Sequence, residues 1–147
     1  MDLNAILAGP GVYLDANVFI YALEGYTRYA GALSTLFDRI DRGDLPAVTS
    51  ELTLAEVLVK PFMNGDLRLV AAYENALQQF GSFKVAPVTR EILLRAARIR
   101  AEVRTLRLPD AIHVATAQAE GCVTILSNDR RLSIVSEPQV VLLSDHC

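Results

Sequence analysis

Residues 12–23 read VYLDANVFIYAL, a short apolar run that ends on Asp15 and is followed by a second apolar segment. The run Val12–Leu14 has no alternation of polar and apolar residues, which is typical of a strand buried on both faces of a parallel sheet. The segment Val18–Leu23 is long enough for one or two helical turns. A buried strand that leads directly into a helix favours an α/β fold.

The same alternation of strand and helix continues along the chain. Helical spacing and capping residues predict helices over 28–42, Glu51–Lys60, 66–80, 90–104 and 109–120. Further strands are predicted at Ala47–Thr49, Phe83–Val88, Val123–Leu126 and Val140–Leu142. We therefore expect an α/β protein, a three-layer α/β/α sandwich with a central parallel sheet of about five strands.

Composition limits the class of protein. The chain has 147 residues, of which 52% are hydrophobic and 21% charged, so one domain over 1–147 is expected and disorder is excluded. No apolar run reaches the roughly 18 residues that a bilayer span needs. The first residues lack the basic and apolar pattern of a secretory signal. We expect a cytoplasmic protein that makes no membrane contact.

The formal charge of −3 conceals an uneven distribution of arginine. Six arginines lie between Arg90 and Arg107, whereas the chain has only two lysines. Overall acidity excludes a nucleic-acid packaging protein but allows an enzyme that meets phosphates through a metal ion or a few arginines. Two cysteines and two scattered histidines suit neither a disulfide framework nor structural zinc.

Four carboxylates are expected at one edge of the sheet, where the working groups of open parallel sheets gather beyond the carboxyl ends of the strands. Asp15 ends the first strand, and Asp129 follows the fourth. Asp110 opens the helix before the fourth strand, and Glu56 lies on the helix after the second.

Each acid also has a simpler explanation. Asp110 suits a helix N-terminus, and Asp129 can cap a short helix over Arg130–Leu132. Glu56 lies among apolar residues, at the edge of a solvated stripe or partly buried with a partner. Asp15 must lie close to the core because it ends a short apolar strand.

Taken together, the four acids favour a metal site. Carboxylates that lie close together repel one another, so at neutral pH they need a cation or raised pKa values. Their hard oxygen ligands suit Mg²⁺ or Mn²⁺. Such a site can activate water and neutralise charge on a phosphodiester under attack.

Four segments resemble the PIN domain family, and the resemblance spans nearly the whole chain. They read YLDANVFI (13–20), TSELTLAEVL (49–58), LPDAIHVATA (108–117) and TILSNDRRL (124–132). The small size of the chain is similar to that of VapC-type toxins, the ribonuclease halves of type II toxin–antitoxin pairs.

The resemblance implies a sheet in the order 3-2-1-4-5, with the first and fourth strands adjacent. Asp15, Glu56, Asp110 and Asp129 match the catalytic, metal-binding acids of the family, and Asn17 and Ser127 match its supporting polar positions. It further implies an Mg²⁺- or Mn²⁺-dependent endoribonuclease with an RNA substrate, a cognate antitoxin and a homodimeric assembly.

Other residues carry weaker signals. His113 lies three residues after Asp110 on the same helix face and could touch the site, but we interpret it as a buried or half-buried structural histidine. Arg130 and Arg131 are candidates for RNA contact because they adjoin Asp129. The arginines from Arg90 to Arg107 are more typical of a solvated helix face.

Two other classes of function remain open. Haloacid-dehalogenase-like phosphatases and receiver domains also place an Asp after the first strand and form an aspartyl-phosphate. The former expect a second Asp where Asn17 stands, and the latter need a late lysine, whereas Lys60 and Lys84 come early. The third possibility is a non-catalytic PIN-like interaction module.

Overall fold

The protein is described here by a computed structural model, which covers residues 2–147. Five parallel strands form one sheet in the order β3-β2-β1-β4-β5. The α/β class and the expected strand order are confirmed. The strands are β1 (Val12–Leu14), β2 (Ala47–Ser50), β3 (Lys84–Ala86), β4 (Thr124–Ser127) and β5 (Gln139–Leu142).

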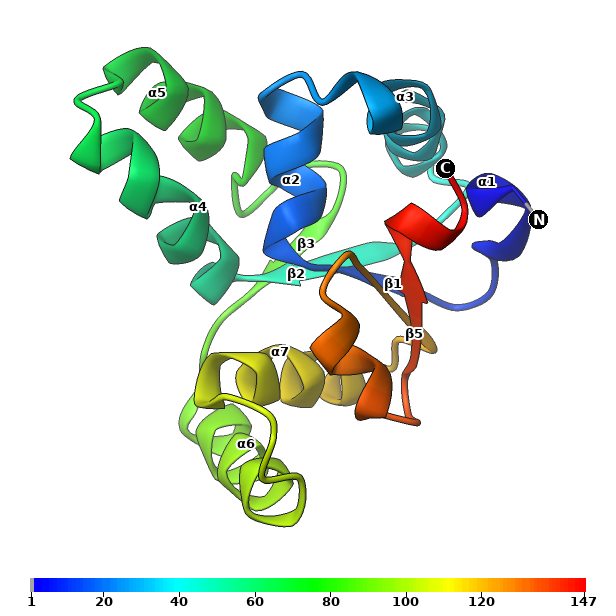
Figure 1. The fold of residues 1–147 in the computed structure, drawn as a ribbon, viewed down its shortest axis with the longest axis vertical. Coiled ribbons are helices and arrows are strands. Elements are labelled where there is room, and N and C mark those ends of the chain that lie inside the picture. The colour runs from blue at the N-terminus through cyan, green and yellow to red at the C-terminus, as the bar shows by residue number, and fades with distance from the viewer. Residues whose placement is uncertain (1) are drawn as a thin grey trace.

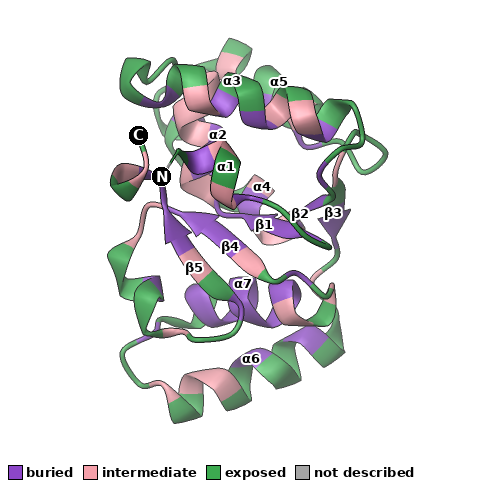
Figure 2. Cartoon of the chain, turned by 90° about the vertical axis from the view of Figure 1, so that its right-hand side faces the viewer, coloured by how far each residue is buried: buried purple, intermediate pink, exposed green. Residues whose placement is uncertain are grey.

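Helices cover both faces of this sheet and make three layers (Figures 1 and 2). One face carries the helices of the first half of the chain, namely α1 (Leu3–Ile6), α2 (Ala16–Leu23), α3 (Thr27–Asp41), α4 (Glu51–Met63) and α5 (Leu67–Ala76). The other face carries α7 (Leu108–Ala119), with α6 (Arg90–Glu102) packed on its outer side. Two 3₁₀ helices, η1 (Arg130–Ile134) and η2 (Leu143–Asp145), flank β5.

Strand β1 shows how the sheet separates two cores. Val12 and Leu14 are buried against the α1–α5 side, whereas Tyr13 is buried in the cluster beside α7. This alternation follows from the two-residue period of a strand. Asp15 follows Tyr13 by two residues, so the strand presents both side chains to the same face, toward α7.

Several predicted boundaries were wrong. Helix α4 continues through Pro61 to Met63 rather than stopping at Lys60. A proline removes only one helical N–H, and Pro61 is buried close to the helix end, where the loss of one hydrogen bond is tolerated. Helix α5 ends at Ala76, short of residue 80, and Leu77 instead turns into the core. Strand β3 and helix α6 are likewise shorter than expected.

None of the helices within residues 2–147 combines the length and apolarity needed to cross a bilayer.

Candidate active site

The site lies where β1 and β4 end side by side. Leu14 pairs with Leu126 in the parallel register, and the Asp15 amide donates to the Leu126 carbonyl at 3.0 Å. The Asp15 side chain caps α2 by accepting a 2.8 Å hydrogen bond from the Ala16 amide. Asp15 as a whole is only 8% exposed, as expected for a residue that closes a buried strand.

Ser127 and Asn17 hold this corner together. The Ser127 hydroxyl donates to Oδ2 of Asp15 at 2.7 Å and accepts from the Asp129 amide at 3.0 Å. The Asn17 amide group donates weakly to Ser127 Oγ at 3.4 Å, while its Oδ1 accepts from the Asn128 amide at 3.1 Å. Both residues therefore fix the end of β4 against Asp15.

Glu56 reaches the same corner from the opposite face of the sheet. It lies on α4, which begins directly after β2 because Ser50 caps the amide of Leu52. Its Oε1 lies 2.5 Å from Nε2 of His113 on α7, and this same nitrogen lies 3.8 Å from Oδ1 of Asp15. One ligand atom from each of Asp15, Glu56 and His113 lies within 4.8 Å of the other two.

A buried tyrosine completes the contacts of the histidine. The Tyr13 hydroxyl lies 2.5 Å from Nδ1 of His113, and both side chains are almost fully buried. Burial, reinforced by the charge of Asp15, raises the pKa of Tyr13 well above its usual value, so the phenol stays protonated. For His113, burial alone would lower the pKa, but the hydrogen bond to Glu56 and the charges of Asp15, Glu56 and Asp110 outweigh it and raise the pKa.

Asp110 lies at the start of α7 and is engaged by an arginine. Its carboxylate accepts from the Arg107 amide at 3.1 Å and from the Arg107 guanidinium at 3.2 and 3.3 Å. The expected helix-terminal role of Asp110 is thus present, although the residue is only 6% exposed and lies close enough to His113 for its charge to raise the pKa of that ring. The hydrogen bond and charge of Asp110 raise the pKa of Arg107.

Asp129 is paired in a similar way. It caps η1 through the Arg131 amide and accepts two hydrogen bonds from the Arg131 guanidinium, at 3.0 and 2.6 Å. The side-chain hydrogen bond from Arg131 lowers the pKa of Asp129 despite partial burial. Arg107 approaches Asp129 at 3.9 Å and so links the two aspartates. Arg130, by contrast, pairs with Asp145 at 2.6 Å.

The four predicted acids therefore divide into two pairs. Asp15 and Glu56 converge on His113, and Asp110 and Asp129 are bridged by Arg107. Burial of His113 was predicted, but its contact with Glu56 was not. Tyr13 and Arg107 were not singled out from the sequence. Tyr13 could have been found because it lies two residues before Asp15 and so points to the same face of the strand. Arg107 could have been found because it lies three residues before Asp110 at a helix start.

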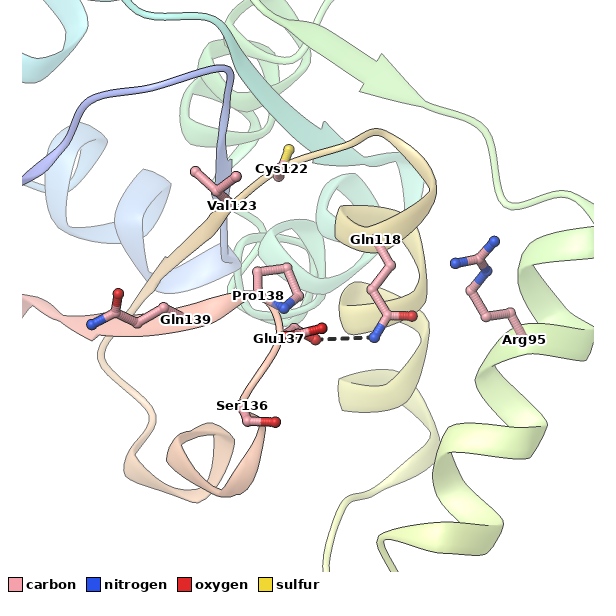
Figure 3. Close-up of a pocket in the computed structure, with 8 residues that line it drawn as sticks. All are labelled: Arg95, Gln118, Cys122, Val123, Ser136, Glu137, Pro138 and Gln139. Atoms are coloured by element: carbon pink, nitrogen blue, oxygen red, sulfur yellow. Dashed lines mark hydrogen bonds between the residues drawn. The ribbon is translucent and has the colours of Figure 1, made fainter.

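A separate concavity lies away from these acids. A pocket of about 670 Å³ is bordered by Val123 and Gln139, which precede β4 and begin β5, so it lies at the amino end of these strands. Figure 3 shows the Gln118 side chain donating to the Glu137 carbonyl across it, at 3.0 Å. In a parallel sheet, reactive groups gather at the carboxyl ends of the strands, so the acidic corner is a stronger candidate for a functional site than this pocket.

Fold and site together define an α/β protein with a carboxylate-rich corner at the carboxyl edge of a 3-2-1-4-5 sheet. The PIN domain family model matches residues 12–138. The chain therefore belongs to the PIN domain family.

Solved structures with the same fold include chains of toxin–antitoxin complexes and one toxin. A toxin–antitoxin complex from Klebsiella pneumoniae is 24% identical, with a TM-score of 0.67 over 90% of this chain and 97% of that one. A chain of DNA-bound VapBC from Salmonella typhimurium is 16% identical to this one, with a TM-score of 0.72, and the match covers 92% of this chain and 99% of that one. VapC20 of Mycobacterium tuberculosis, a sarcin-ricin loop cleaving toxin, is 17% identical with a TM-score of 0.67, and the match covers 86% of this chain and 95% of that one. No curated protein sequence gave a match.

Proposed function

We propose that this protein is an Mg²⁺- or Mn²⁺-dependent endoribonuclease that hydrolyses phosphodiester bonds of RNA. The observation that supports this proposal most is the convergence of Asp15 and Glu56 at the end of β1, with Asp110 and Asp129 at the same rim. Four acids so placed carry more negative charge than Arg107 and Arg131 offset.

The donor set suits a hard divalent cation. Asp15, Glu56, Asp110 and Asp129 supply carboxylate oxygens, the ligands that Mg²⁺ and Mn²⁺ prefer. Asp15 is preoriented by Ser127 and by the Ala16 amide, each of which bonds one of its two oxygens. When bound, the ion would lower the pKa of a coordinated water and neutralise charge on the phosphate.

The protein's own groups would orient the reacting phosphate. Arg131 and Arg107 already lie on the rim, half exposed and within reach of Asp129. A guanidinium that holds a carboxylate can bind a phosphate with the same forked geometry. Arg131 is the better candidate for RNA contact than Arg130, because Arg130 is directed toward Asp145.

We further propose that the enzyme is the toxin of a toxin–antitoxin pair, with a cognate antitoxin and a homodimeric assembly. The support is the common fold with the Klebsiella and Salmonella complexes, which contain both components. Light scattering of the purified chain would then give twice the protomer mass of 16.1 kDa.

Cleavage of total RNA by the purified chain tests the enzymatic proposal. We expect cleavage with Mg²⁺ or Mn²⁺, none with excess EDTA, and loss of at least a hundredfold in rate for Asp15→Asn. Asp38→Asn, which alters an exposed acid on α3, is the matched control and should cleave normally. Equal cleavage by Asp15→Asn and wild type would contradict the proposal. A stable beryllofluoride adduct at Asp15 would favour an aspartyl-phosphate enzyme, and folded protein without divalent-metal binding would favour an interaction module.

A further inference from the structure

His113 is in direct contact with a proposed metal-binding acid, yet it is too deeply placed to meet an RNA strand. The residue is 2% exposed and lies beneath the rim, one helical turn after Asp110. Its ring is wedged between Tyr13 on one side and Glu56 on the other. These three residues come from β1, α7 and α4, which also carry or adjoin three of the four acids.

The hydrogen-bond directions in this chain of groups are determined by the chemistry of its ends. A carboxylate only accepts, so the bond between His113 and Glu56 requires a proton on Nε2. The Tyr13 hydroxyl can either donate to Nδ1 or accept from it, so it satisfies this nitrogen whether or not the nitrogen carries a proton. Both buried ring nitrogens then have a partner, as buried polar groups require.

Glu56 depends on this contact more than the other acids depend on theirs. Asp15 receives hydrogen bonds from Ala16 and Ser127, and Asp110 and Asp129 each receive several from arginine. Within residues 2–147, His113 is the one partner that the structure records for the Glu56 carboxylate. The Glu56 side chain is 34% exposed, so without His113 it would sample several rotamers in water.

We infer that His113 is a positioning residue that holds the Glu56 carboxylate beside Asp15, and that Tyr13 fixes the histidine ring in the donating orientation. This inference rests on the proposed function and deepens it, because it explains how an acid on a long, mobile side chain joins a site of otherwise short aspartates. The histidine acts through Glu56 and does not itself contact the metal ion or the RNA. Mutation of a residue that orients a metal ligand typically lowers metal affinity or activity by about 10- to 100-fold.

Two amide variants, each of which replaces one ring nitrogen of His113, separate positioning from packing. In His113→Gln the side-chain amide nitrogen occupies nearly the place of Nε2 and can still donate to Glu56. In His113→Asn the amide occupies the place of Nδ1, next to Tyr13, and cannot reach Glu56. A packing role would show in the free energy of unfolding, which both replacements should lower because each leaves space in a buried site. A positioning role shows in Mn²⁺ affinity, which only His113→Asn should lower, because only it loses the donor to Glu56.

Calorimetric titration of the full-length chain with Mn²⁺ is the test. We expect His113→Asn to weaken Mn²⁺ binding about 10- to 100-fold and His113→Gln to remain within about threefold of wild type. Tyr13→Phe, which removes only the hydroxyl, should fall between them. At limiting Mn²⁺, RNA cleavage by His113→Asn should be well below that of wild type. At saturating Mn²⁺, its kcat should return closer to the wild-type value.

The outcomes against the inference are distinct from those against the proposed function. Equal Mn²⁺ affinities of His113→Asn and His113→Gln, whether both normal or both reduced, would overturn positioning through Glu56. A ¹⁴N coupling in the pulsed EPR spectrum of the Mn²⁺ complex that disappears in His113→Gln would overturn it too, because it would make His113 a direct ligand. Absence of Mn²⁺ binding by folded wild-type chain would overturn the proposed function, and the inference with it.

Discussion

The hydroxyl of Ser127 donates a 2.7 Å hydrogen bond to Oδ2 of Asp15, although the two residues are 112 positions apart in the chain. The same hydroxyl oxygen accepts the Asp129 amide, so one buried side chain connects the ends of β1 and β4. This connection is possible because the two strands are neighbours in parallel register, with Leu14 opposite Leu126. The central position of β1 and β4 is therefore what brings distant acids to one corner.

Removing this hydroxyl should affect both stability and metal binding. Ser127→Ala leaves the Asp129 amide without its acceptor and Oδ2 of Asp15 without a donor, and an unsatisfied buried group costs about 1–3 kcal/mol. We expect a comparable loss in the free energy of unfolding and roughly tenfold weaker Mn²⁺ binding. Denaturant unfolding measures the change in stability, and calorimetric titration measures the change in Mn²⁺ affinity. Ser133→Ala, in an exposed position of η1, is the control and should change neither.

Arg131 and Arg130 should differ although they are adjacent. Arg131 holds Asp129, whereas Arg130 holds Asp145. Removing the cation beside Asp129 should strengthen Mn²⁺ binding by about two- to fivefold, since like charges repel. The same Arg131→Ala change should raise KM for RNA, because a phosphate contact is lost. Arg130→Ala is expected to leave both quantities close to wild type, and equal effects of the two substitutions would argue against a directed role for Arg131.

The sequence was sufficient for the sheet and for the location of the acids. Apolar strands ending on Asp15 and followed by Ser127–Asp129 predict a parallel sheet with carboxylates at one edge, and the structure has that sheet. The pairing of Asp110 with Arg107, and of Asp129 with Arg131, was not predicted. Such pairs depend on side-chain rotamers and on loops such as residues 103–107, which hydrophobic periodicity does not describe.

The histidine illustrates a second limit of sequence reasoning. Burial of His113 follows from its apolar helix face, but its partners lie on β1 and α4, 100 and 57 positions away. No local pattern encodes contacts at that separation. Helix α4 shows the opposite case, in which a strong local signal, Pro61, was overridden by packing of its ring in the interior.

The ion pair of Asp129 predicts a pH-dependent stability. The carboxyl pKa is lower in the folded chain than in the unfolded one, so the pair stabilises the fold at pH values above about 4. This contribution is lost as the pH falls through the lower, folded-state pKa. The difference in unfolding free energy between wild type and Arg131→Ala should therefore be largest near pH 6 and shrink on acidification. A difference that stays constant down to pH 2.5 would contradict this account.

The two cysteines should react very differently. Cys122 is buried, and burial raises the pKa of its thiol to about 11, so little thiolate forms at neutral pH. Cys147 is exposed. Titration of the native chain with a disulfide reagent should modify one thiol quickly, and unfolding in denaturant should release the second. Rapid modification of both thiols in the native chain would show that the core around Cys122 opens readily.

Tyr73 provides a stability test that should leave the active site untouched. Its ring is fully buried on α5, and its hydroxyl donates a 2.5 Å hydrogen bond to Glu24 at the C-terminal end of α2. Burial, together with Glu24, raises the pKa of this phenol, so it remains a donor at all ordinary pH values. Asp15 caps the other end of α2, about two turns away. Tyr73→Phe should therefore lower the free energy of unfolding by about 1–2 kcal/mol, which corresponds to a fall in Tm of about 2–8 °C.

The companion variant Glu24→Gln retains an acceptor for Tyr73 but removes its charge. If the charge strengthens the bond, Glu24→Gln should lose part of the stability that Tyr73→Phe loses, and the double variant should lose less than the sum. The kcat/KM for RNA cleavage should be unchanged in all three, because the hydrogen bond fixes α5 against the far end of α2 and touches none of the four acids. A variant that kept its Tm but lost cleavage would instead place the α2–α5 contact within the active machinery.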